Sequence, residues 1–181
     1  REMHTSRCLS TRSRAGLFGL ATSLALLLLL LASCRTVAPT EADVLRRQVL
    51  RGYEHMMASD YASLVAMLAP LAELHGVDGQ VVDRAKLDKL AARVAAMRRG
   101  DLTATESAEL QAFLAKRQAW AKRAHASARF EAIVVDGDSA IVTTYDRGTP
   151  GKLEKSVYSF RRMSGEWLLE KELSTHVAEG D

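Results

Sequence analysis

Cysteine is almost absent from the 181-residue sequence, with Cys8 and Cys34 as its only two examples. Because no cysteine follows Cys34, the rest of the chain can form no disulfide and can offer no thiolate as a nucleophile or metal ligand. A domain built from that part of the chain must therefore be held together by its apolar core.

An excess of charge of one sign is also missing from most of the chain. The net charge is +3 overall, but residues 1–33 hold four arginines and one glutamate. That leaves 21 basic and 21 acidic residues from Cys34 onward. Since nucleic-acid-binding domains carry a basic surface, we expect no nucleic-acid partner.

Residues that carry catalytic or metal chemistry do not form a recognised motif. The histidines are scattered without metal-ligand spacing, and the sequence has neither a nucleophile-elbow serine nor a phosphate-binding glycine loop. The best candidates, His75 with Asp78 and the run Tyr53-Glu54-His55, are more typical of helix ends and surfaces. We expect no catalytic residues, no metal site and no cofactor.

One long apolar run is present near the start of the sequence. Arg7, Arg12 and Arg14 precede an uncharged stretch from Ala15 to Cys34, an order typical of a secretory signal. The run of about 19 apolar residues is also just long enough for a membrane-spanning helix. Length alone therefore leaves both interpretations open.

The four residues that end this run resemble a lipobox. Leu31, Ala32 and Ser33 put a branched aliphatic side chain three positions before Cys34 and small side chains directly before it. In bacterial lipoproteins, which this pattern resembles, the signal is cut just ahead of a cysteine that carries diacylglycerol. The resemblance implies a signal peptide over residues 1–33, cleaved between Ser33 and Cys34. An uncleaved span and an ordinary cleaved signal are the alternatives.

The same resemblance predicts a location. A lipid on Cys34, including palmitate, would hold the chain on a bacterial membrane, and residues 34–40 would be a short tether. Arg35 stands where, in the lipoproteins of enteric bacteria, an aspartate tends to retain the product in the inner membrane. We therefore expect anchoring to the outer membrane, with the domain facing the periplasm.

Residues 41–181 are long enough for one core and are expected to form a single domain. From about 41 to 128, apolar residues recur every three or four positions, which predicts four helices. Capping boxes that begin at Thr40 and Thr103 introduce the first and the last of them.

The two middle helices are less clearly delimited. The second is expected to cover "DYASLVAMLAPLAEL" from Asp60, with Leu71 and Leu74 in its apolar stripe and with Pro70 as a kink. The third is expected over about 82–99, where many alanines favour a helix.

The period changes to two at Arg129. Four alternating runs over about 129–173 predict an antiparallel meander, with hairpin turns at Gly137 and Gly165. The alternation groups six side chains by face: Ile141, Thr143 and Tyr145 in the second strand, and Trp167, Leu169 and Lys171 in the last. We expect an α+β fold in which the N-terminal helices pack on one face of this four-stranded meander.

Two parts of the sequence resemble a known fold. The stretch "MMASDYASLVAMLAP" is similar to a helix-to-helix passage of the SnoaL-like, nuclear-transport-factor-like cone fold. The stretches "VVDGDSAIVTTY" and "YSFRRMSGEWLLEKE" resemble its closing strands. That fold usually interleaves a strand or hairpin where this chain is expected to have helices, so the resemblance implies a modified cone.

Two functions remain open. The preferred one is a lipid-anchored cell-envelope protein whose non-catalytic domain binds an apolar small molecule or an envelope protein through Tyr145, Tyr158 and Trp167. The alternative, implied by the resemblance, is a SnoaL-like enzyme that uses a general acid and base in a cone cavity. A buried titratable group in the cavity would favour the enzyme, whereas an apolar cavity or none would favour the first function.

Overall fold

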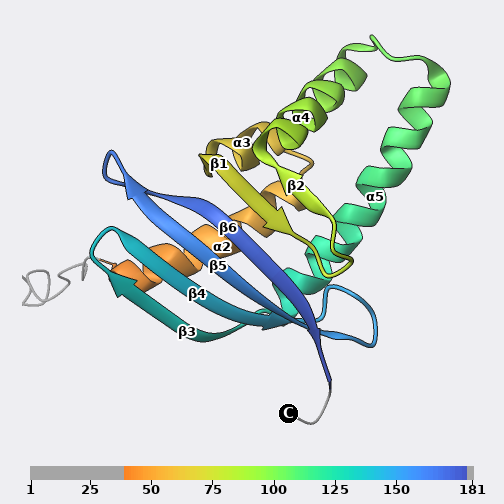
Figure 1. The fold of residues 1–181 in the computed structure, drawn as a ribbon. Coiled ribbons are helices and arrows are strands. Elements are labelled where there is room, and N and C mark those ends of the chain that lie inside the picture. Colours follow the sequence, from red (N-terminus) through yellow and green to blue (C-terminus); the bar gives the residue numbers. More distant parts are fainter. Residues whose placement is uncertain (1–38, 179–181) are drawn as a thin grey trace, which may run out of the picture. The chain divides into compact units, whose positions relative to one another are not determined.

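The structure is a computed structural model that describes residues 39–178 (Figure 1). In chain order, the elements are α2 (Glu41–Met57), α3 (Tyr61–Ala66), β1 (Leu68–His75), β2 (Val81–Asp83), α4 (Arg84–Arg99), α5 (Ala104–Ser127), β3 (Arg129–Asp136), β4 (Ser139–Asp146), β5 (Leu153–Met163) and β6 (Glu166–Val177). Within this part of the chain, the strands form one sheet in the order β2-β1-β6-β5-β4-β3. The predicted α+β class is confirmed.

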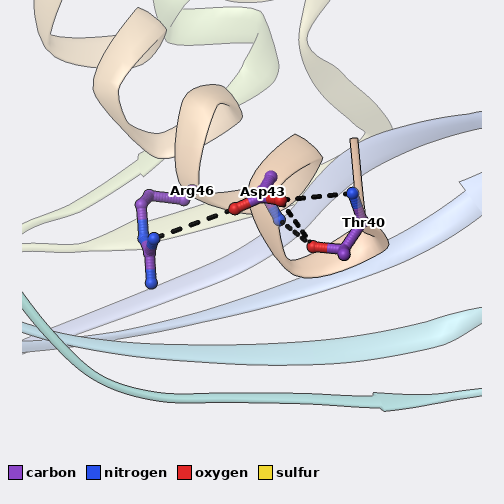
Figure 2. A network of polar contacts seen from close by, with 3 residues as sticks. All are labelled: Thr40, Asp43 and Arg46. Carbon is purple, nitrogen blue, oxygen red and sulfur yellow. Dashed lines mark hydrogen bonds and ion pairs between the residues drawn. The ribbon is translucent and has the colours of Figure 1, made fainter. Parts of the chain in front are cut away.

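Helix α2 begins at the predicted capping box. The Asp43 backbone N–H donates to Thr40 Oγ1 (3.2 Å), and the Thr40 N–H and hydroxyl donate to Asp43 Oδ2 at 3.2 and 2.7 Å (Figure 2). These hydrogen bonds lower the pKa of Asp43, with a further contribution from Arg46, which lies 3.9 Å away. The carboxylate therefore stays charged at the positive end of the helix. Thr103 and Glu106 form the second predicted capping box, at α5.

The predicted second helix is wrong after its first two turns. Helix α3 stops at Ala66, and the chain continues as strand β1, in which Leu71 is 92% exposed rather than part of an apolar stripe. Pro70 cannot donate the backbone hydrogen bond that a helix requires. It lies where the pairing of β1 with β6 is irregular, between Leu68 and Glu73, so the sheet needs no donor there.

The predicted four-stranded meander is correspondingly incomplete. Strands β3 to β6 do pair antiparallel in sequence order, but β1 pairs parallel with β6, and the short β2 pairs antiparallel with β1. The sheet is therefore six-stranded and mixed. The addition of β1 satisfies backbone groups that β6 would otherwise leave unpaired at an edge.

Helix α2 crosses one face of the sheet (Figure 1), and this covered face is not the one carrying Ile141, Thr143 and Tyr145. Those three side chains share the opposite face, where Ile141 is 49% exposed, while Ala140 and Val142 are buried under α2. Because β4 has apolar or β-branched residues on both faces, its alternation alone does not identify the covered side.

A bulge in β6 decides which of its side chains enter the covered face. Leu169 pairs with Phe160, whereas the next pair is Lys171 with Ser159, so β6 contains one extra residue. The uninterrupted alternation predicted from sequence would put Lys171 beside Leu169. The bulge instead turns Lys171 outward and brings Glu172 onto the covered face.

Two apolar clusters stabilise the domain. The first joins α2 to the sheet and α5 through side chains such as Leu45, Val49 and Phe160. The second joins α3 and β1 to α4 and α5, with Leu68 and Leu114 among its buried members. Between residues 39 and 178, no helix is sufficiently long and apolar to cross a membrane.

Candidate functional site

A cavity of about 380 Å³ lies between α2 and the covered face of the sheet, with further walls from α3, the β1–β2 hairpin, α4 and α5. Most of its lining is apolar, and several of the lining side chains are aromatic: Tyr53, Tyr61, Phe113, Trp120, Tyr158 and Phe160. Its volume falls in the range of small-molecule sites, which are typically apolar with a few polar groups.

Two tyrosines and an aspartate make a buried hydrogen-bonded group at the cavity wall. The Tyr53 hydroxyl donates to Asp146 Oδ2 (3.1 Å) and lies 2.9 Å from the Tyr158 hydroxyl. Because the one Tyr53 proton is directed at Asp146, Tyr158 must donate to Tyr53. Burial raises the pKa of both phenols, so both remain protonated. Helix α2 is thereby connected to β4 and β5.

Glu172 is the acidic group that the bulge brings to the cavity. Its Oε1 accepts a hydrogen bond from Ser174 Oγ (3.1 Å), and Ser174 Oγ lies 2.7 Å from Ser156 Oγ. Burial raises the pKa of Glu172 to about 7, the charges of Asp146 and Glu154 add to the rise, and the Ser174 hydrogen bond opposes it. The carboxyl group can therefore both accept and release a proton near neutral pH.

Glu154 is a second acidic residue of the lining, and its side chain is only 1% exposed. One of its oxygens, Oε1, accepts a hydrogen bond from the Thr149 backbone N–H (3.2 Å). Within the described part of the chain, the other oxygen has no hydrogen-bond partner.

Asp146 is also 1% exposed and contacts the lining residue Tyr53 without lining the cavity itself. Burial raises the pKa of Asp146, although hydrogen bonds from Gly148 and Tyr53 oppose the rise.

The turn after β4 holds Asp146 in place. The Gly148 N–H donates to Asp146 Oδ1 (2.9 Å), and the Gly148 carbonyl accepts from Arg123 Nε (2.7 Å). Trp120 packs so closely on this turn that a Cβ at position 148 would lie 2.3 Å from its Nε1. Glycine is therefore required by the close approach of the indole ring.

The three residues predicted to form a contact face do not share one face of the sheet. Tyr158 and Trp167 are both buried in the first apolar cluster; Tyr158 also lines the cavity, and the Arg162 guanidinium lies over the Trp167 ring at 4.5 Å. Tyr145 lies on the opposite face, where the Lys155 ammonium sits 5.3 Å from its ring centre. The predicted lipid site and cleavage point, Cys34 and Ser33, lie outside the described residues.

The weaker candidates from the sequence are also placed. His75, Asp78 and Tyr53 all line the cavity, although His75 Nε2 already lies 3.1 Å from Glu73 Oε2. His55 is 3.6 Å from Asp60, away from the cavity lining. In the described range, no three acidic, histidine or cysteine side chains gather as metal ligands would.

Sequence reasoning missed the acidic residues of the site. Glu154, Ser156 and Tyr158 alternate in β5, a period-two polar pattern that signals a polar patch on the covered face. That signal was available in the sequence. Glu172 gave no such signal, because its orientation depends on the bulge in β6.

Comparison with known proteins gives similarities in structure only. No family model matches the sequence, and neither does any curated protein. An NTF2-like protein with a cystatin-like fold from Novosphingobium aromaticivorans is 16% identical, with 93% of this chain and 94% of that chain covered and a TM-score of 0.49.

Two further solved structures are similar to this chain. A cystatin-like-fold protein of unknown function from Nostoc punctiforme is 16% identical over 77% of this chain and 95% of that chain, with a TM-score of 0.48. An NTF2-like protein of unknown function from Silicibacter pomeroyi is 14% identical over 74% and 92%, with a TM-score of 0.45.

Proposed function

We propose that the domain binds a small organic molecule in the cavity between α2 and the sheet. The observation that carries this proposal is a volume of about 380 Å³ with apolar walls and one end lined by hydroxyl and carboxyl groups. Apolar walls supply affinity through burial, and a few polar groups fix the orientation of the ligand. A protein-contact role would require no such cavity.

Native mass spectrometry of the full chain, purified gently from its own envelope extract, tests this proposal. We expect an added mass of a few hundred daltons that is lost on denaturation. The variant Gly52→Leu should lose it, because a Cβ at this lining position has only Leu64 nearby, at 3.9 Å, and a larger side chain would project into the cavity. Gly52→Ala, the matched control, should retain it. A bare mass for the wild-type chain would contradict the proposal.

General acid–base catalysis is a second candidate, favoured by one observation. A titratable group in the cavity favours the enzyme alternative, and Glu172, with a pKa of about 7, is such a group. A general base is most effective when its pKa lies near the working pH. In this role Glu172 would remove a proton from the bound molecule.

The probe 5-nitrobenzisoxazole tests this candidate, since loss of its ring proton to a base breaks the N–O bond and releases a coloured phenolate. We expect a rate above the buffer background that rises with pH through about 7, as Glu172 becomes ionised. Glu172→Gln should lose this rate, while Glu131→Gln, on the opposite face of the sheet, should retain it. Equal rates in wild type and Glu172→Gln would rule out this role for Glu172.

The fold assignment and the location are part of the same proposal. A sheet covered on one face by helices and enclosing a cavity is consistent with a modified SnoaL-like cone. We propose that Cys34 carries the lipid and that the domain stands at the outer membrane, facing the periplasm. Metabolic labelling with palmitate tests the anchor: Cys34→Ala should take up no label, and labelling at the wild-type level would contradict it.

A further inference from the structure

The polar end of the cavity holds carboxyl groups that have no ion-pair partner among the described residues. Glu154 and Glu172 line the cavity, and Asp146 lies behind Tyr53. Across residues 39–178, none of these three carboxylates forms an ion pair with a lysine, arginine or histidine of the described chain. Buried carboxylates are ordinarily paired, because burial of an isolated charge costs several kcal/mol.

Glu154 is the clearest case of an incomplete set of partners. Its side chain is 1% exposed and faces the cavity, yet it accepts one hydrogen bond, from the Thr149 N–H to Oε1. A carboxylate can accept about four hydrogen bonds, and Oε2 of Glu154 has none from the described residues. This oxygen is therefore available to a donor that enters the cavity.

The basic residues of the lining do not neutralise this end. Arg117 is an exposed residue of α5 whose guanidinium lies over the Phe113 ring at 5.4 Å, and His75 already contacts Glu73. The remaining walls are apolar or aromatic, with Tyr61 and Trp120 among them. Aromatic faces attract organic cations as well as apolar groups.

We propose that the ligand of this cavity is an organic cation, a protonated amine or quaternary ammonium group carried on an apolar or aromatic body. This inference rests on the proposed small-molecule-binding function and specifies its ligand class. The cationic group supplies the positive partner that the carboxyl groups of Glu154 and Glu172 lack, and the body fills the apolar part of the cavity. An anionic ligand would be repelled by the same carboxylates.

The proposal includes a direction of pH dependence. The titratable groups that line the cavity or border its polar end come from seven elements and the β1–β2 loop: Tyr53, Tyr61, His75, Asp78, Arg117, Asp146, Glu154, Tyr158 and Glu172. Of these, Glu172 has a pKa of about 7. Binding of a cation favours its ionised form, so binding releases a proton and becomes tighter as the pH rises through 7.

Three indole probes with the same ring test the charge preference: tryptamine is cationic, tryptophol neutral and indole-3-acetate anionic. Binding to the full chain in nonionic detergent is measured by titration calorimetry at pH 8 and pH 5.5. We expect tryptamine to bind at least ten-fold more tightly than tryptophol at pH 8, and indole-3-acetate to give no binding heat. The amine remains protonated at both pH values, since its pKa lies near that of lysine, about 10.4.

Two variants connect the preference to the named carboxylates. Glu154→Gln and Glu172→Gln should each lower the affinity for tryptamine toward the affinity for tryptophol. Glu172→Gln should also remove the pH dependence of tryptamine binding. The control Glu131→Gln removes a negative charge from the opposite face of the sheet and should change neither the affinity for tryptamine nor its pH dependence. If the variants do not fold, the charge series and pH profile of the wild-type chain still decide the question.

The outcomes separate this inference from the proposed function. Equal binding of the three probes, or preference for the alcohol or the acid, overturns the cationic ligand and leaves a small-molecule site in place. Binding of none of the probes also overturns it. Only the bare mass in the native measurement on the wild-type chain overturns the proposed function itself.

Discussion

The Tyr53 hydroxyl donates a hydrogen bond to Asp146 Oδ2 over 3.1 Å, which joins the middle of α2 to the end of β4 in the protein interior. The same oxygen of Tyr53 accepts from Tyr158. These two hydrogen bonds therefore contribute to the stability of the fold and also fix part of the cavity wall, because Tyr53 and Tyr158 line the cavity.

Tyr53→Phe should lower the free energy of unfolding by about 1–3 kcal/mol, because it leaves the buried Asp146 carboxylate with the Gly148 N–H as its remaining partner. Urea unfolding followed by circular dichroism measures the change. Tyr61→Phe is the matched control: Tyr61 is also buried, but its hydroxyl makes no hydrogen bond within residues 39–178, so the effect should be about 0.5 kcal/mol or less. Equal effects of the two variants would show that the Tyr53 hydroxyl does not stabilise the fold.

Gly148→Ala should destabilise the protein by about 1–3 kcal/mol, since the new Cβ would overlap the Trp120 indole at 2.3 Å and force it to move. Gly52→Ala should instead stabilise the protein. Its Cβ meets only Leu64 at 3.9 Å, and alanine is the better helix former by about 1 kcal/mol. Thermal unfolding of both variants measures whether each substitution raises or lowers the stability. A neutral effect of Gly148→Ala would contradict the close contact between position 148 and Trp120.

Trp167→Ala should cost about 3–5 kcal/mol of unfolding free energy, because the indole is 7% exposed within the first apolar cluster. Phe113→Ala, at a side chain that is 40% exposed, should cost less than half as much. Chemical unfolding compares the two variants. A near-neutral Trp167→Ala would return Trp167 to the role of a surface contact residue.

The parts of the fold that depend on adjacent residues could be predicted from sequence. The capping boxes at Thr40 and Thr103 and the hairpin turns at Gly137 and Gly165 each depend on residues a few positions apart. Strand β1 could not be predicted in this way. Its apolar residues fit a helical stripe as well as a strand, and its partner β6 lies at the far end of the sequence.

The candidate site follows the same division. Tyr158 could be selected as a buried aromatic residue of a strand, and Glu154 lies in a visible alternation. Glu172 could not be assigned, because one extra residue in β6 reverses which side chains face α2. The charge of the cavity therefore depends on a register detail that the sequence pattern does not encode.

Glu172 should make the stability of the protein fall as the pH rises from about 4.5 to about 7. Its pKa is raised from 4.5 to about 7 in the folded state, so the folded protein holds a proton that the unfolded chain releases. Ionisation of this partly buried group then costs up to about 3 kcal/mol, and the loss is complete above the folded-state pKa. Urea unfolding at a series of pH values, compared with Glu172→Gln, isolates this effect from that of Asp146, whose pKa is also raised. The difference between the two proteins should change across this window and be constant above it, and parallel profiles would show that Glu172 is ionised throughout.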